Sequence, residues 1–288
     1  MSMGIVQITG EQLSRKEVKE ICERLANHRI QLLSLRGCRM KNSCYTHLMQ
    51  SLGGCKSIVQ LNLNIGVVRT LSRVHSLSHV LTQNRSLTSL FLHGCSLGYE
   101  GAALLAQGLA LHPNIVSLDL GDCCMTDSAL MGISDLLPPN GAKRGLQDLT
   151  LSGNAGVTAH GWSKFFIALA AGSELQTLHI DYNNIMDYGT GCLAVALAAS
   201  KTLKFVDLES CGLTELGGQT LLHLVRNFPI SCLRITLSGN NITPSTLSAI
   251  RSVLNSSETE TSSSSGSDAN DHATPTEDLC HHGTAFNL

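Results

Sequence analysis

One short segment of the chain has the spacing of a catalytic serine motif. Residues 94–98 read Gly-Cys-Ser-Leu-Gly, which matches the G-x-S-x-G turn that exposes the nucleophilic serine of α/β-hydrolases. Such a serine needs a histidine and an acid supplied by a larger α/β domain. Cys95 and Leu97, however, fall at positions of a sequence repeat where buried residues are expected. We therefore interpret the match as accidental and predict no hydrolase.

Cysteines and histidines are the other residues that could react or bind metal. The chain has 11 cysteines, and Cys280, His281 and His282 are adjacent near its C-terminus. Three neighbouring donors in a polar segment rarely make a specific site, and four other cysteines occupy a repeat position that calls for Cys or Asn. Neither a P-loop nor an isolated dinucleotide-binding fingerprint occurs, so the phosphate cradle of a nucleotide site is missing. We predict no metal, no cofactor and no catalytic residues.

Composition excludes several classes of partner. Hydrophobic residues make up 43% of the chain but aromatic residues only 4%, so the core must be aliphatic. The net charge of -2 is too near neutral to favour nucleic acid. The most apolar stretch, residues 193–199, is far shorter than the roughly 20 residues that span a bilayer, so no membrane association is expected. Without a secretory signal pattern, the cysteines favour a reducing, cytoplasmic location.

A repeat of 28 to 31 residues organises the chain. Its template is L-x-x-L-x-L-x-x-N/C-x-L, whose eleven positions are numbered from the first leucine. The longest step contains an extra loop at residues 138–143, and the copy that begins at Leu146 has an inserted residue near Gly156–Val157. A degenerate copy opens the chain at Val6, Ile8 and Leu13. The full copies begin at Ile30, Ile58, Leu87, Ile115, Leu146, Leu175, Leu203 and Cys232.

Each repeat predicts one short strand followed by one helix. The L-x-L centre indicates a strand, and spacings such as Leu105 to Leu109 are helical. Successive parallel strands need right-handed crossovers, and helices are wider than the strand spacing, so the array must curve. We predict one domain over residues 1–254, a degenerate repeat plus eight full repeats, closed by a helix from Pro244. Residues 255–288 are acidic and Ser-rich, which predicts a disordered tail.

The segments LLSLRGCR, QLNLNIGVV, SLFLHG and SLDLGDC resemble ribonuclease-inhibitor-type leucine-rich repeats, which also occur in NOD-like receptors and Ran GTPase-activating proteins. The resemblance covers nearly all of residues 1–254. It implies an α/β fold, the leucine-rich-repeat horseshoe solenoid, with a parallel sheet on the concave face and helices on the convex face. It also implies a protein-interaction role. No nucleotide-binding domain precedes the first repeat, so we do not expect a switch ATPase.

The concave face is the predicted binding site, because template positions three, five and seven should point outward from the sheet. These positions place an acidic tract on four consecutive repeats, with one further acid beside it and two aromatic residues as anchors. Two histidines are interpreted as exposed polar residues without a paired catalytic role. An alternative is that the acids only keep the face solvated. The candidate residues are Phe91, His93, Asp119, Asp122, Asp148, His179, Asp181, Phe205, Asp207 and Glu209.

The predicted function is a non-catalytic adaptor, a monomer that binds a partner protein on this face, where the acidic tract suits a basic partner. One alternative is a small-GTPase regulator of the Ran-GTPase-activating type, although the outward strand positions offer only Arg36 and Arg234 as basic groups. Another is a purely structural relic of a receptor's sensing region. The C-terminal residues 285–288 could also add to the sheet edge of a PDZ domain.

Overall fold

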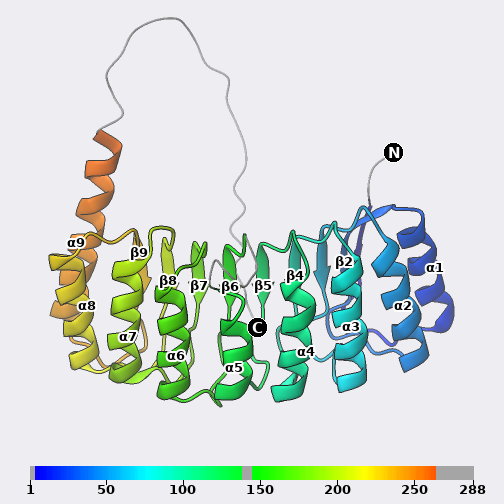
Figure 1. Ribbon diagram of the computed structural model, residues 1–288, viewed down its shortest axis with the longest axis horizontal. Helices are drawn as coiled ribbons and strands as arrows, with labels where there is room; N and C mark the ends of the chain where they lie inside the picture. Colours follow the sequence, from blue (N-terminus) through cyan, green and yellow to red (C-terminus); the bar gives the residue numbers. More distant parts are fainter. Residues whose placement is uncertain (1–3, 138–144, 264–288) are drawn as a thin grey trace, which may run out of the picture.

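The computed structural model describes residues 4–137 and 145–263, with side chains as far as residue 255. In these residues, nine strands alternate with nine helices along the chain, and the strands form one parallel sheet in sequence order (Figure 1). The elements are β1 (Gly4–Gln7), α1 (Arg15–Ala26), β2 (Ile30–Ser34), α2 (Asn42–Gly54), β3 (Gln60–Asn62), α3 (Leu71–Gln83), β4 (Ser89–Phe91), α4 (Gly98–Ala110), β5 (Ser117–Asp119), α5 (Asp127–Ser134), β6 (Asp148–Thr150), α6 (Ala159–Ala170), β7 (Thr177–His179), α7 (Met186–Ala199), β8 (Phe205–Asp207), α8 (Glu215–Asn227), β9 (Arg234–Thr236) and α9 (Pro244–Ser263).

The strands from β3 to β9 are three residues long and occupy template positions three to five. Their central residues stack in register along the sheet, as Leu90, Leu118 and Leu149 do in β4, β5 and β6. These leucines are at most 1% exposed, whereas the residues on either side face outward. The alternation of a strand therefore separates the core from the open face of the sheet, as the template predicts.

The helices lie side by side along the other face of the sheet, as the labels α2 to α8 show in Figure 1. Each helix buries an apolar stripe, such as Leu105 and Leu109 of α4, against the strand leucines. A helix occupies roughly 10 Å across the array, but neighbouring strands are only about 4.8 Å apart. The layers therefore curve with the sheet inside and the helices outside, and the horseshoe prediction is confirmed.

The ninth template position stabilises the turn that follows each strand. Asn154 is fully buried, and its side-chain nitrogen donates to the carbonyl oxygens of Leu120 at 3.0 Å and Leu151 at 2.9 Å. Its side-chain oxygen accepts the backbone N–H groups of Cys123 at 3.0 Å and Met125 at 3.2 Å. These bonds join two repeats and satisfy groups that leave the sheet. Cysteines use the same position with one thiol donor: Cys38 to Ile8, Cys95 to Leu63, Cys123 to Leu92 and Cys211 to Ile180.

The inserted residue near Gly156 coincides with a missing hydrogen bond in the next repeat. Asn183 occupies the ninth position there, and its side-chain nitrogen donates to Leu151 and Ile180 as the pattern requires. Its buried side-chain oxygen has no hydrogen-bond partner in the part of the chain that the structure describes. The equivalent oxygen of Asn154 receives two N–H groups from the repeat before it, but the turn that faces Asn183 carries the insertion. A longer turn displaces the donors that the regular turn supplies.

Both ends of the array contain more regular structure than the sequence predicts. The degenerate opening copy forms a complete strand and helix, β1 and α1, with an irregular register between Gly4 and Ile5. The closing helix begins at Pro244 as expected but continues to Ser263, beyond the expected boundary at residue 254. The loop at residues 138–143 and the tail after Ser263, including Cys280 to His282 and residues 285–288, lie outside the described residues.

Candidate functional site

The predicted site residues lie on the sheet or in the turns that follow its strands. None of the ten is buried: Asp122 and Asp148 are exposed, and the other eight are half-buried. They form a band across the sheet from β4 to β8. The two residues of β4 and its turn are Phe91 and His93, and the acids follow from β5 to β8. The outward orientation predicted for template positions three, five and seven is therefore what the structure shows.

The first half of the band contains a histidine–aspartate pair. His93 Nδ1 lies 3.6 Å from Asp119 Oδ1, which belongs to the next repeat. A hydrogen bond with Asp119 raises the pKa of His93, and burial opposes that rise only in part. Asp119 also accepts the backbone N–H of Gly121 at 2.9 Å. This aspartate thus holds the turn after its strand, and it is not simply solvated.

A second pair lies in the C-terminal half. His179 Nδ1 is 3.8 Å from Asp207 Oδ2, and Asp207 Oδ1 accepts the backbone N–H of Glu209 at 3.1 Å. Burial alone would raise the pKa of Asp207, but hydrogen bonds with His179 and Glu209, together with the charge of Arg234, lower it. Asp207 is therefore an ionised group that both organises a turn and contributes negative charge to the face.

The ring of the aromatic anchor Phe205 is already in contact with two neighbouring side chains, which its sequence position does not reveal. The edge of the His179 ring packs against it with the ring centroids 5.2 Å apart, and the guanidinium of Arg234 lies 5.2 Å from its centroid. Arg234 comes from β9 and is exposed. A partner that uses Phe205 would have to share or displace this cation–π contact.

Sequence reasoning missed three polar side chains that contact the C-terminal acids. Ser152 donates to Asp181 from the preceding repeat. Glu209 accepts the Tyr182 hydroxyl at 2.8 Å and the Ser238 hydroxyl at 3.0 Å. Ser152 and Ser238 occupy the outward seventh position, so the template alone could have placed them beside these acids. The contacts of Tyr182 depend on its backbone conformation, which the template does not reveal.

Three residues of the band could in principle coordinate a cation. His179, Asp181 and Asp207 each offer one donor atom, and these atoms all lie within 4.8 Å of one another. All three are already engaged, however: Asp181 by Ser152, and His179 and Asp207 by each other. The absence of a metal remains a prediction.

The serine motif builds a turn. Cys95 is fully buried and donates its thiol to Leu63, and Leu97 is 6% exposed, as the repeat requires. The hydroxyl of Ser96 lies 3.8 Å from the thiol of Cys124 in the next repeat. Cys95 and Leu97 thus have the structural roles that the repeat assigns to them.

The ten cysteines of the described residues are all free thiols, and eight of them are buried.

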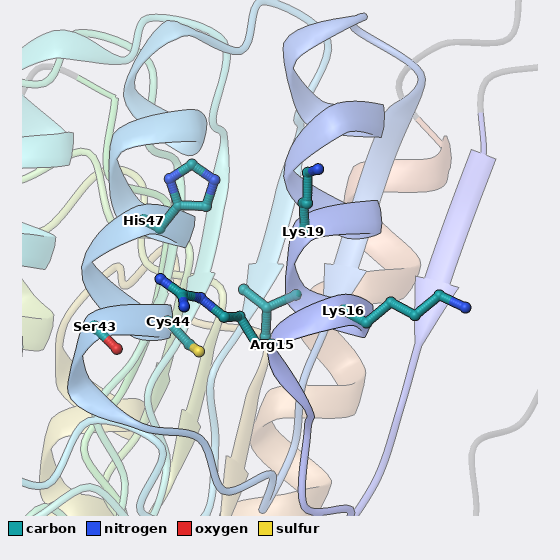
Figure 2. Close-up of a pocket in the computed structure, with 7 residues that line it drawn as sticks. Arg15, Lys16, Lys19, Ser43, Cys44 and His47 are labelled. Atoms are coloured by element: carbon teal, nitrogen blue, oxygen red, sulfur yellow. The ribbon is translucent and has the colours of Figure 1, made fainter.

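A cavity of about 640 Å³ lies on the opposite, helical surface, between α1 and α2 (Figure 2). Its lining includes the side chains of Val18 and Cys44. Arg15 extends toward Ser43 and Cys44, whereas Lys16 points away from them. The cavity is basic at its margin and is formed by different elements from the acidic band.

Among the described residues, no helix combines the length and hydrophobicity needed to cross a bilayer.

Comparison with known proteins agrees with this architecture. The family described as Leucine Rich repeat matches residues 83–106 and 112–134. A chain of the crystal structure of the yeast Rad7 and Elc1 complex superposes with a TM-score of 0.58 at 16% identity, covering 83% of this chain and 57% of that one. The leucine-rich repeat-containing protein LegL7 from Legionella pneumophila superposes with a TM-score of 0.51 at 15% identity, covering 87% and 92%. At these identities the likeness concerns the fold alone.

Sequence relatives place the chain more narrowly. Leucine-rich repeat-containing protein 73 of Homo sapiens is 47% identical over 255 residues, which cover 88% of this chain and 81% of the relative. The Rattus norvegicus protein of the same name is 46% identical with the same coverage. NACHT, LRR and PYD domains-containing protein 14 of Mus musculus is 27% identical, and the match covers only 26% of its length. The chain therefore belongs to the leucine-rich repeat family, in the group that includes leucine-rich repeat-containing protein 73.

Proposed function

We propose that this protein is a non-catalytic adaptor that binds a basic partner protein on the concave face of its sheet. A leucine-rich-repeat scaffold fits protein–protein interaction in general. The observation that supports the finer proposal is the distribution of charge on this face. Asp148 and Asp181 carry negative charge there, and Glu209 adds a carboxylate held by two hydroxyl groups. Such complementary charge mainly raises the association rate and the specificity of binding.

The acids differ in the side chains that they contact. Asp119 and Asp207 each face a histidine of the preceding repeat and hold a backbone turn. Asp148 is exposed, and the contacts of Asp181 and Glu209 come from neutral hydroxyl groups. We assign the partner's cations to Asp148, Asp181 and Glu209, because neutral hydrogen-bond donors leave a carboxylate's charge intact.

The test replaces these three acids without changing their shape. The triple variant Asp148→Asn, Asp181→Asn, Glu209→Gln is compared with a control triple of exposed acids that lie outside the sheet, Glu100→Gln, Asp135→Asn, Glu174→Gln. Proximity labelling in cells should identify partners that the concave variant loses and the control keeps. With a purified partner, we expect affinity to fall roughly tenfold or more, and this loss should shrink at high salt. Equal labelling by both variants would contradict the proposal.

Regulation of a small GTPase is the alternative function on the same scaffold. It would be distinguished by adding the purified protein to a panel of small GTPases and measuring GTP hydrolysis. The adaptor proposal expects unchanged rates for every GTPase. If the protein stimulates GTP hydrolysis and the concave triple variant does so equally, the GTPase-regulator function would be supported instead of the adaptor function.

A further inference from the structure

The sixth full repeat, which begins at Leu175, departs from the template at an exposed turn. The eighth position adopts positive φ in all eight full repeats and is glycine in four of them: Gly37, Gly94, Gly153 and Gly239. In the copy that begins at Leu175 this position is Tyr182, with φ 56°. A left-handed backbone is unfavourable for a side chain of this size, so local folding does not explain the choice of tyrosine.

A second departure follows four residues later. The position that caps the next helix is threonine in neighbouring repeats, and Thr214 and Thr243 accept backbone N–H groups at 3.3 and 3.4 Å. Here it is Met186, also in the left-handed region at φ 59°, and α7 has no side-chain cap. In this one repeat, large side chains, Tyr182 and Met186, therefore occupy the positions where other repeats have a glycine and a capping threonine. Locally unfavourable choices of this kind concentrate at functional sites.

The large side chains at this turn are exposed. Tyr182 is 55% exposed, Met186 46%, Tyr188 64% and Leu216 67%. Tyr188 and Leu216 occupy equivalent positions in the first turns of α7 and α8, which lie side by side (Figure 1). Asp187 joins the same two turns by accepting the backbone N–H groups of Thr214 and Gly217. We call Tyr182, Met186, Tyr188 and Leu216 the rim patch.

The rim patch continues into the acidic face. Tyr182 follows Asp181 directly, and its hydroxyl donates to Glu209 at 2.8 Å. Its backbone N–H donates to the carbonyl oxygen of Glu209, also at 2.8 Å. Met186 leans over the following repeat, where its sulfur would lie 2.8 Å from a Cβ placed on Gly212. Apolar and acidic groups are therefore held next to each other by fixed contacts between repeats.

We propose that the rim patch binds the apolar side of a basic amphipathic helix in the partner protein, while the lysines or arginines of that helix reach Asp181 and Glu209. This inference rests on the proposed function and narrows the partner's chemistry. Exposed tyrosine and methionine are residue types enriched in interface cores. A helix fits because it presents apolar side chains at i, i+3, i+4 and i+7 with cations beside them.

The experiment uses labelled synthetic peptides and fluorescence anisotropy with the full chain. One peptide has leucines at the helical spacing and lysines elsewhere, a second has serines in place of the leucines, and a third has glutamates in place of the lysines. The rim variant is Tyr182→Gly combined with Met186→Thr. This variant should remain folded, because Tyr182→Gly removes a large side chain from a left-handed position, and a thermal melt would verify that it does. It should nevertheless bind the leucine–lysine peptide at least tenfold more weakly.

Matched variants separate this proposal from the proposed function. Ile65→Gly makes the same glycine replacement at an exposed eighth position far along the sheet, and its affinity for the leucine–lysine peptide should be unchanged. The concave triple variant should lose both lysine-containing peptides. Unchanged binding by the rim variant, or equal wild-type affinity for the leucine and serine peptides, would overturn the rim assignment alone. Unchanged binding of the serine–lysine peptide by the concave triple would instead contradict the acidic surface.

Discussion

Ile65 shows most directly how residue type and backbone conformation compete in this chain. It lies at the eighth template position with φ 58° and is 45% exposed. A β-branched side chain is strained in this region by about 1–2 kcal/mol. We expect Ile65→Gly to raise the free energy of unfolding by about 1 kcal/mol, after allowing for the greater flexibility of glycine in the unfolded chain. Urea denaturation followed by circular dichroism would measure the change.

The control for this prediction is Val59→Gly, just before β3. Val59 is similarly exposed at 41% but is not among the residues of positive φ. Glycine there should destabilise the protein, because it adds flexibility without relieving strain. If both substitutions lower stability, the left-handed conformation of Ile65 carries no measurable cost.

Asn154 provides the second prediction at the scale of one residue. Its buried amide joins two repeats through donors to Leu120 and Leu151 and acceptors from Cys123 and Met125. Asn154→Ala leaves these four backbone groups without their partner, and we expect a loss of about 3 kcal/mol in unfolding free energy. Chemical denaturation measures it. The control Asn184→Ala removes one exposed hydrogen bond, to Ala155, and a comparable loss there would refute the special role of the ninth position.

At the scale of elements, acids in the first turn of one helix cap the next helix. Asp127 accepts the backbone N–H and the hydroxyl of Thr158, both at 2.7 Å. Asp187 binds Thr214 in the same way, and Glu215 accepts the backbone N–H of Thr243 at 2.8 Å. These carboxylates satisfy helix N-termini across repeat boundaries. They couple neighbouring helices in addition to the apolar contacts between them.

The cap formed by Glu215 predicts a pH dependence. Hydrogen bonds, first from the Thr243 backbone and then from Thr246 and Gln219, lower its pKa from 4.5 to about 2. A carboxyl group whose pKa falls on folding stabilises the native state above pH 4.5, and that contribution disappears as the pH falls from 4.5 toward 2. Glu215→Gln should therefore be less stable than wild type at pH 7, and the difference should shrink at pH 3.

Urea denaturation at both pH values would test this cap, with Glu174→Gln as the control because Glu174 lies outside the described helices and is exposed. The control should track the wild type at both pH values. A stability difference for Glu215→Gln that stays constant down to pH 3 would show that the carboxylate charge does not contribute to the cap.

At the scale of the whole molecule, each repeat is supported only by its neighbours, so damage in the middle should spread. Leu151 is fully buried after β6, and Leu151→Asp places a charge in the core at a cost of several kcal/mol. Trp162, the single tryptophan, is buried in α6 of the same repeat and reports on this region by fluorescence. We expect a large fall in the denaturation midpoint. The matched change Ile167→Asp, at a position 63% exposed in α6, should have little effect.

Much of the candidate surface was predictable because strand alternation is local. Once Leu118 of β5 and Leu120 just after it face the core, Asp119 must face outward, and the same reasoning places Asp148 and Asp207. The pairing of His93 with Asp119 was not predictable, since it joins template position seven of one repeat to position five of the next. The contact of Arg234 with Phe205 likewise depends on how side chains from adjacent strands lean across the sheet.

The repeat in the amino-acid sequence is enough to predict the period, the direction of the sheet, the inward and outward faces and the capping role of the ninth position. These depend on hydrophobic periodicity and on backbone groups that must be satisfied wherever the repeat occurs. Only the folded molecule shows which acids pair with a histidine, where the left-handed turns expose Tyr182 and Met186, and how an insertion deprives Asn183 of its donors. Those features arise from distances between repeats, which no single repeat encodes.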